Sequence, residues 1–274
     1  MATAPLLPSY QALFAPIAQQ ASGATALGWS GQSDTAVLRG HSLLPLGLGE
    51  WATIASHLPI VLVPTGTTGE PPAWCAAAAL GLSEDQNLCL GPKGGWIPPV
   101  QPRAAQLLPF GLTGDPLQVG AATASSAIGQ GAGFMALVDG EGRPSPAVAE
   151  RLQLAQQWAA QLAAAAAAVA RLDGLGLLEP FPSPAGLRLN PELAEAKVLS
   201  RSALRQLDDT QLLALHHEGL LEAAHALLFS TQQLQRLLRM LQVRRNQPQP
   251  AAAASGHAGG PRQPRDPISG QPLA

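Results

Sequence analysis

The segment from Pro146 to Asp173 constrains the fold of this chain more than any other feature. It contains no glycine and only its initial proline, in a chain whose 28 glycines and 26 prolines are about a fifth of all residues, against roughly 12% on average. Its central block, Ala163–Ala168, is strongly helix-forming. Ser145 before Pro146 is typical of a helix N-terminus, and Gly174 is typical of a helix end. The segment predicts one helix roughly 40 Å long, with small side chains that let a neighbouring element approach closely.

The residues before this helix carry short apolar runs, each bounded by turn-forming residues as strands are. We predict a small, mostly antiparallel sheet from them. The strands are expected at Pro59–Val63, Trp74–Leu80, Asn87–Leu90, Leu107–Gly111 and Phe134–Val138. A short helix is expected over Leu46–His57, because its apolar residues recur at helical spacing.

The residues after the long helix return to helical periodicity. Extended stretches are predicted at Leu187–Leu189 and Ala196–Leu199. Ser202 and Asp208 are candidate N-caps, and Asp208 with a glutamine three residues later predicts a capping box. The fold class is therefore α+β: a small, mostly antiparallel β domain packed with a helical C-terminal half, followed by a disordered tail.

Changes in composition divide the chain into four parts. Residues 1–40 are expected to be an irregular N-terminal segment and residues 41–145 a β-rich half. Residues 146–246 form the helical half, which we expect to be one compact unit with 41–145. Residues 247–274 are rich in proline, glycine, alanine and glutamine without apolar periodicity, which is typical of a disordered tail.

Cysteine usage and the N-terminus bear on the compartment. Cys75 and Cys89 lie in apolar stretches at a spacing that matches no metal or redox motif, so we predict buried free thiols, with one disulfide as the alternative. No basic side chain precedes Arg39, and no apolar run is long enough to cross a bilayer. We expect a cytoplasmic protein without membrane-spanning segments, with export that needs no signal peptide as the alternative.

The charge distribution bears on the partners. A formal net charge of -2 with only 12% charged residues gives no electrostatic basis for binding nucleic acid. Arginines nevertheless gather near the C-terminal end, where no acidic residue lies between Glu222 and Asp266. Contact with an anionic surface through this end is one interpretation, and a solvated helix end is the other.

The motifs of common enzymes are absent. The sequence has no HExxH, no GK[ST] and no GxSxG motif, and its glycine-rich stretches lack the flanking strand and helix of a nucleotide site. His216 and His217 are adjacent and are expected to be exposed, whereas His225 is expected to be partly buried between the last helices. We therefore expect no catalytic residue, no cofactor and no metal.

Aromatic residues beside prolines offer one candidate binding surface. Trp96, Pro98 and Phe110, if carried on consecutive strands, could form a shallow surface for a peptide or a glycan. The alternative is that they anchor the core, because the chain has only 4% aromatic residues with which to build one.

Four patches in a fixed order resemble a known family. They are Leu43-Leu44-Pro45-Leu46 through Pro59-Ile60-Val61; Ala79-Leu80-Gly81-Leu82 through Gly95-Trp96-Ile97-Pro98 to Pro109-Phe110; Ala136 to Pro146; and Leu175 to Pro180 through Ala224 to Ser230. Over residues 40–243 this order resembles the bacterial SapC-like family. The segment between Pro98 and Pro109 departs from the family pattern, because it lacks the tyrosines and the paired arginines and keeps only Arg103.

The resemblance implies a protein of mixed α and β structure linked to surface-layer assembly or outer-membrane uptake, with no established catalytic residues. We therefore expect a non-catalytic accessory or binding protein whose partner is a surface-layer, secretion or uptake protein. The expected binding residues are Trp96, Pro98, Arg103, Phe110 and His225. The alternative is an enzyme, or the partner of one, that acts on peptides or amino-acid side chains, with Trp96, Arg103 and His225 lining one pocket.

Overall fold

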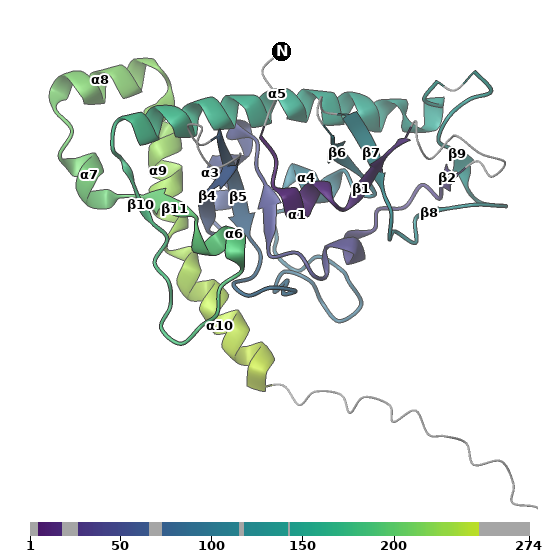
Figure 1. Ribbon diagram of the computed structural model, residues 1–274, viewed down its shortest axis with the longest axis horizontal. Coiled ribbons are helices and arrows are strands. Elements are labelled where there is room, and N and C mark those ends of the chain that lie inside the picture. The colour runs from purple at the N-terminus through teal and green to yellow at the C-terminus, as the bar shows by residue number, and fades with distance from the viewer. Residues whose placement is uncertain (1–4, 18–26, 66–72, 115–117, 142, 247–274) are drawn as a thin grey trace, which may run out of the picture. The chain divides into compact units, whose positions relative to one another are not determined.

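The strands of the computed structural model form three antiparallel sheets, over which the longest helix runs (Figure 1). The structure describes residues 5–17, 27–65, 73–114, 118–141 and 143–246. The chain separates into two units, Met1–Leu241 and Gln242–Ala274. All sheets and all hollows described below belong to the first unit.

The largest sheet has five strands in the order β10-β11-β4-β5-β3. Their bounds are β3 Leu43–Pro45, β4 Ile60–Thr65, β5 Ala73–Ala79, β10 Leu178–Pro180 and β11 Lys197–Leu199. The predicted strands at 59–63 and 74–80 pair with each other over the full length of β4. Every residue of β5 after Ala73 is buried, so this hairpin lies at the centre of the core.

Two smaller sheets join distant parts of the chain. One has the order β1-β7-β6 and the other β8-β2-β9. Their strands are β1 Phe14–Pro16, β2 Gly28–Trp29, β6 Phe110–Thr113, β7 Gln118–Ala122, β8 Ile128–Gly129 and β9 Met135–Ala136. Residues 1–40, expected to be irregular, thus contain two strands, the short helix α1 (Pro8–Gln11) and a 3-10 helix in their described part.

The predicted long helix is confirmed as α5 (Pro146–Gly174), which packs against β5, β6 and β7 (Figure 1). Its buried residues recur at helical spacing: Val148, Ala155, Trp158, Leu162, Ala165, Ala168, Val169 and Leu172. Because β5 also consists largely of alanine, helix and strand can approach closely. Ser145 occupies the predicted N-cap position, but its hydroxyl donates to the Ala136 carbonyl instead of capping the helix.

Short helices complete the unit. Before α5 these are η1 Thr35–Leu38, η2 Leu48–Glu50, α3 Trp51–Ala55 and α4 Arg103–Gln106. After it come α6 Pro191–Ala194, α7 Arg201–Arg205, α8 Asp209–His217, α9 Leu220–Ser230 and α10 Gln233–Asn246, of which α10 continues past Leu241, the last residue of the unit. The capping box of Asp208 is confirmed at α8, whereas Ser200, and not Ser202, caps α7. The α+β class with a helical C-terminal half is confirmed.

The core has two clusters of buried apolar side chains. The larger cluster surrounds the central hairpin and includes Tyr10, Trp51 and Trp158. The smaller cluster is centred on Trp29 and Phe110, whose rings meet edge to face with centroids 5.3 Å apart. Both cysteines belong to the larger cluster and are buried as thiols and not joined in a disulfide, as predicted.

Some local predictions were wrong for identifiable reasons. Residues 87–90 form a turn and not a strand, because the Asn87 side chain donates to the Leu38 carbonyl and accepts from the Cys89 N–H. Residues 187–189 also form no strand. The strand expected at 107–111 begins only at Phe110, since α4 and the turn after it occupy the preceding residues.

Two further predictions concern the membrane and the tail. Within the described part of the chain, no helix is both long enough and apolar enough to span a bilayer. The predicted disordered tail, residues 247–274, lies outside the described residues.

Candidate functional site

The predicted aromatic surface of Trp96, Pro98 and Phe110 does not form. Phe110 is fully buried in the smaller core cluster. Trp96 is half-buried against the larger cluster, and its indole Nε1 donates to the Val100 carbonyl at 2.8 Å. Pro98 is buried. Phe110 therefore anchors the core and Trp96 packs against it, in agreement with the alternative interpretation.

Arg103 lies at a hollow of about 340 Å³ between the start of α4 and the middle of α5. Its neighbours there include Glu50, Trp158 and Gln161. The Glu50 carboxylate accepts hydrogen bonds from the Gly47 N–H at 2.9 Å, from Trp158 Nε1 at 3.1 Å and from the Arg103 N–H. A single carboxylate thus joins the β3–α3 connection, α4 and α5.

The environment of Glu50 shifts its acidity. Burial raises the pKa of Glu50 above its ordinary value, against the opposing effect of its hydrogen bonds and of the Arg103 charge. A raised pKa in a hollow is one mark of a functional acid. All of the N–H groups that Glu50 binds, however, belong to the protein framework. We therefore assign this carboxylate a structural role.

His225 is exposed, contrary to the prediction that it is partly buried. Helix α9 packs against α3, β4 and β11 and buries Ala224, Leu227 and Leu228. The opposite face carries Leu221, His225 and Phe229, which are four residues apart and so lie along one stripe. The His225 ring stacks on Phe229 with centroids 6.3 Å apart, and its Nδ1 contacts the Leu221 carbonyl at 2.7 Å.

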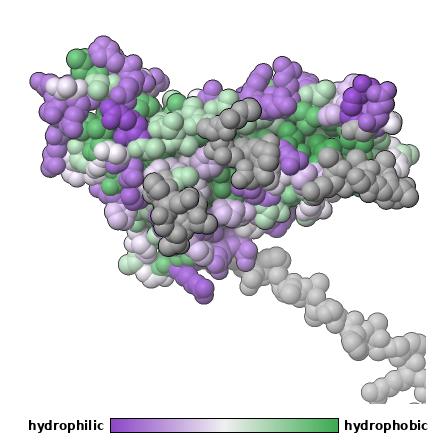
Figure 2. All heavy atoms as spheres, turned by 45° about the horizontal axis from the view of Figure 1, so that its top comes forward, coloured by the Kyte–Doolittle hydropathy of each residue, from purple (hydrophilic) through white to green (hydrophobic). Residues whose placement is uncertain are grey.

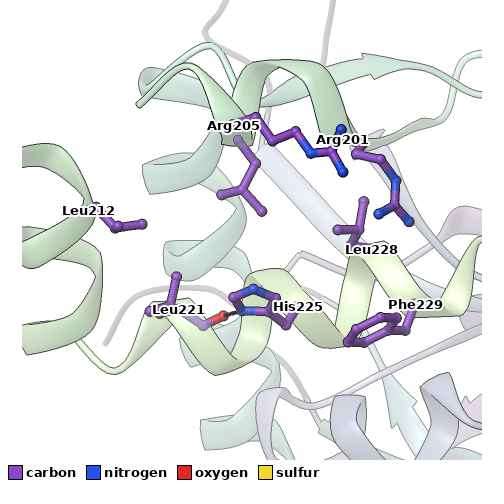
Figure 3. Close-up of a pocket in the computed structure, with 8 residues that line it drawn as sticks. Arg201, Arg205, Leu212, Leu221, His225, Leu228 and Phe229 are labelled. Atoms are coloured by element: carbon purple, nitrogen blue, oxygen red, sulfur yellow. Dashed lines mark hydrogen bonds between the residues drawn. The ribbon is translucent and has the colours of Figure 1, made fainter. Parts of the chain in front are cut away.

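This stripe forms one wall of a hollow of about 370 Å³ between α7, α8 and α9, which we call the helical groove (Figure 3). Arg201 and Arg205 of α7 lie opposite the stripe, and Leu212 enters from α8. Leu204 and Leu228 complete the lining. The groove therefore combines an apolar floor with two guanidinium groups at one side.

Exposed apolar side chains are concentrated around this groove. Of the six large apolar residues that are exposed in the described part of the chain, three lie on α8 and α9: Leu212 at 41%, Leu213 at 55% and Phe229 at 53%. Figure 2 shows apolar patches within an otherwise polar surface over α7 and α8, at the left of the view. A second hollow of about 370 Å³ lies on the other side of His225 and Phe229, against α3. Because exposed apolar side chains gather here, this groove is the candidate functional site of the described residues.

The described residues contain no candidate metal site. No group of three or more histidine, cysteine, aspartate or glutamate side chains among them could hold a metal ion. Burial also raises the pKa of the Cys75 thiol to about 12, which removes it as a nucleophile near neutral pH.

Most of the residues that line the groove were not predicted from the sequence. Of its lining residues, only His225 was predicted as a site residue, and that side chain was expected to be partly buried between the last helices. Two signals were available: the spacing of Leu221, His225 and Phe229 along α9, and the pair Arg201 and Arg205 one turn apart on α7. Neither signal shows by itself that the two helices face each other.

Comparison with known proteins places the chain in a family. A family model described as SapC matches residues 25–237, which is most of the chain and includes the groove. Searches of curated proteins and of solved structures found no match. The range agrees with the resemblance seen in the sequence over residues 40–243. The chain belongs to the SapC family.

Proposed function

We propose that this protein is a non-catalytic accessory protein that binds a protein partner through the helical groove. The observation that carries the proposal is the concentration of exposed apolar side chains at one place, Leu212 and Phe229 above all. Exposed apolar groups of this size cost free energy in water, and a partner that covers them recovers it.

The shape of the site favours binding over chemistry. The groove is lined mainly by leucine side chains and one aromatic ring, with few polar groups. The only acid–base side chain in its lining is His225, and no described carboxylate or thiol lies beside it in the lining. The lining thus offers His225 neither a nucleophilic side chain nor a second acid–base group with which to act.

The partner class follows from the family resemblance. SapC-like proteins are linked to surface-layer assembly and to outer-membrane uptake, and we extend that link to this chain. The expected partner is therefore a surface-layer, secretion or uptake protein.

The test is an affinity capture from the organism that encodes the chain, analysed by quantitative mass spectrometry. The baits are the full chain and the Leu212→Ser/Phe229→Ser variant, with Ile97→Ser as a matched control. Ile97 is 55% exposed and lies outside the groove. All three changes replace an exposed apolar side chain with a small polar one, so none should disturb the core.

The proposal predicts surface-layer, secretion or uptake proteins that the full chain and Ile97→Ser capture equally and the double variant loses. Equal capture by all three baits contradicts the groove as the docking site. A further bait that ends at Gln247 tests the arginine-rich end. Loss of the partner with that bait alone contradicts docking through the groove and favours contact through the arginine-rich end.

The alternative function, an enzyme acting on peptides, required Trp96, Arg103 and His225 to line one pocket. In the described part of the chain, Arg103 and His225 line different hollows. The geometry therefore gives no support to that arrangement.

A further inference from the structure

Arg201 and Arg205 are two cations without an acidic partner among the described residues. The ion pairs of the described part join Arg143 to Asp139 and Glu141, Arg171 to Glu218, and Lys197 to Asp173. Arg201 and Arg205 are exposed and lie one helical turn apart on the groove side of α7 (Figure 3). Like charges at this spacing repel each other, so an anion between them would relieve that cost.

The guanidinium groups define the kind of anion. Arginine presents a planar fork of N–H donors that matches the two oxygens of a carboxylate. The apolar floor lies directly beside these donors, because Leu204 on α7 and Leu212 on α8 line the same hollow. The groove therefore suits a ligand in which a carboxylate is close to bulky apolar groups.

His225 adds a third feature that a ligand can match, a hydrogen-bond acceptor. Its Nδ1 lies 2.7 Å from the Leu221 carbonyl, which can only accept a hydrogen bond, so Nδ1 donates. In the neutral ring, Nε2 is then an acceptor. The ring projects from α9 into the groove (Figure 3), and a ligand with an N–H group can satisfy it.

A peptide supplies all three features at once. Its backbone provides N–H groups, aspartate or glutamate provides the carboxylate, and leucine or phenylalanine fills the floor. A volume of about 370 Å³ is at the small end of ligand sites and accommodates a few side chains rather than a folded surface. A fatty acid would offer a carboxylate and apolar groups but no N–H donor.

We infer that the helical groove recognises an acidic, apolar peptide segment of the partner, through its carboxylates on Arg201 and Arg205 and its apolar side chains on the leucine floor. The inference rests on the proposed function and specifies its partner. Two arginines are too few for a phosphate backbone, which needs an extended basic track, and the formal net charge of the chain is -2.

The inference is tested by fluorescence anisotropy with a labelled decapeptide of leucine and glutamate. Its counterpart has glutamine in place of every glutamate. We expect the acidic peptide to bind the full chain about tenfold or more tightly than its counterpart, with an affinity that falls as salt increases. Arg201→Gln/Arg205→Gln should weaken the acidic peptide about tenfold or more and leave the neutral one unchanged.

Matched controls separate this recognition from overall charge. The variant Lys93→Gln/Arg188→Gln removes the same charge from two exposed positions outside the groove and should bind the acidic peptide as the wild type does. The inference is overturned if the full chain binds both peptides equally. It is also overturned if the groove variant and the control variant lose the same amount of affinity for the acidic peptide. Tighter binding to vesicles of phosphatidylglycerol and phosphatidylcholine than to the peptide also overturns it, in favour of an anionic surface.

The affinity capture distinguishes failure of this inference from failure of the proposed function. A partner lost by Leu212→Ser/Phe229→Ser but kept by Arg201→Gln/Arg205→Gln leaves docking in the groove intact and overturns recognition of carboxylates. A partner kept by both variants overturns the proposed function itself. A partner lost by both variants but kept by Lys93→Gln/Arg188→Gln supports both proposals.

Discussion

At the scale of single residues, Glu50 holds together parts of the chain that are far apart in sequence. It accepts hydrogen bonds from Gly47, Arg103 and Trp158. A glutamine in its place keeps the shape but turns one end of the side chain into a donor that faces another donor. A glutamine therefore cannot accept all three of these hydrogen bonds.

We expect Glu50→Gln to lower the free energy of unfolding by about 1–3 kcal/mol at pH 7, because at least one buried N–H loses its acceptor. Urea denaturation followed by circular dichroism measures this change. Glu150→Gln is the matched control, since Glu150 is an exposed glutamate on α5. An unchanged urea midpoint for Glu50→Gln would show that these hydrogen bonds contribute nothing to the stability of the fold.

The same pair of variants gives a pH dependence with a definite sign. Burial raises the pKa of Glu50 above its ordinary value, so the folded chain holds this proton to a higher pH than the unfolded chain does. The contribution to stability is then complete below the unfolded pKa and is lost as pH rises through the folded pKa. The free energy of unfolding of the wild type should therefore exceed that of Glu50→Gln by the largest amount in acid, and by a smaller amount at higher pH. A difference that is constant or grows with pH contradicts this assignment.

At the scale of elements, the turn between α8 and α9 sets the direction of one groove wall. Gly219 there has φ 70°, a left-handed conformation. A Cβ at this position would meet no atom within 4 Å, so only the backbone conformation disfavours a larger residue.

We expect Gly219→Ala to lower the free energy of unfolding by about 1 kcal/mol. Gly174 is the matched control, because its Cβ would also meet nothing within 4 Å but it lies at the end of α5 without a positive φ. Gly174→Ala should leave stability unchanged or raise it by up to about 1 kcal/mol. Thermal melts of the two variants should shift in opposite directions, or only that of Gly219→Ala should shift. Equal shifts would contradict the conformational argument.

The elements also show what could be predicted from the sequence. The long helix and the central hairpin carry their signals locally, in helical spacing and in apolar runs between turns, and both predictions were confirmed. The strands β1 and β7 were missed because Phe14 pairs with Ala122, which lies more than 100 positions further along the chain. The run Gln118–Ala122, which contains a glycine and two alanines, has little strand propensity of its own.

At the scale of the whole molecule, the two thiols report on global unfolding. Cys75 lies in β5 and Cys89 in the loop after it, and both are buried in the larger core cluster. A thiol reagent requires the thiolate and physical access. Burial limits both, since it also raises the pKa of Cys75 to about 12.

We expect both cysteines to react with a maleimide at pH 8 only at the rate at which the chain unfolds. The reaction should accelerate with urea in parallel with the loss of the circular dichroism signal, and fully unfolded protein is the control. Fast labelling that does not depend on urea would show that the core opens locally around β5.

The site was harder to predict than the fold for a reason of scale. Arg103 and His225 were identified one at a time, from motifs and residue type, whereas a hollow depends on how helices face each other. Trp96 and Phe110 were expected together but belong to different core clusters, because the residues between them form α4 and a turn instead of a simple hairpin.

The helical groove lies within one continuous stretch of chain, residues 201–229, whereas every sheet joins residues from distant positions. Substitutions that reshape the groove therefore leave the strand registers untouched. Under the proposed function, partner specificity can diverge among descendants of this gene through mutations in one short stretch of coding sequence, while selection on the remainder preserves foldability.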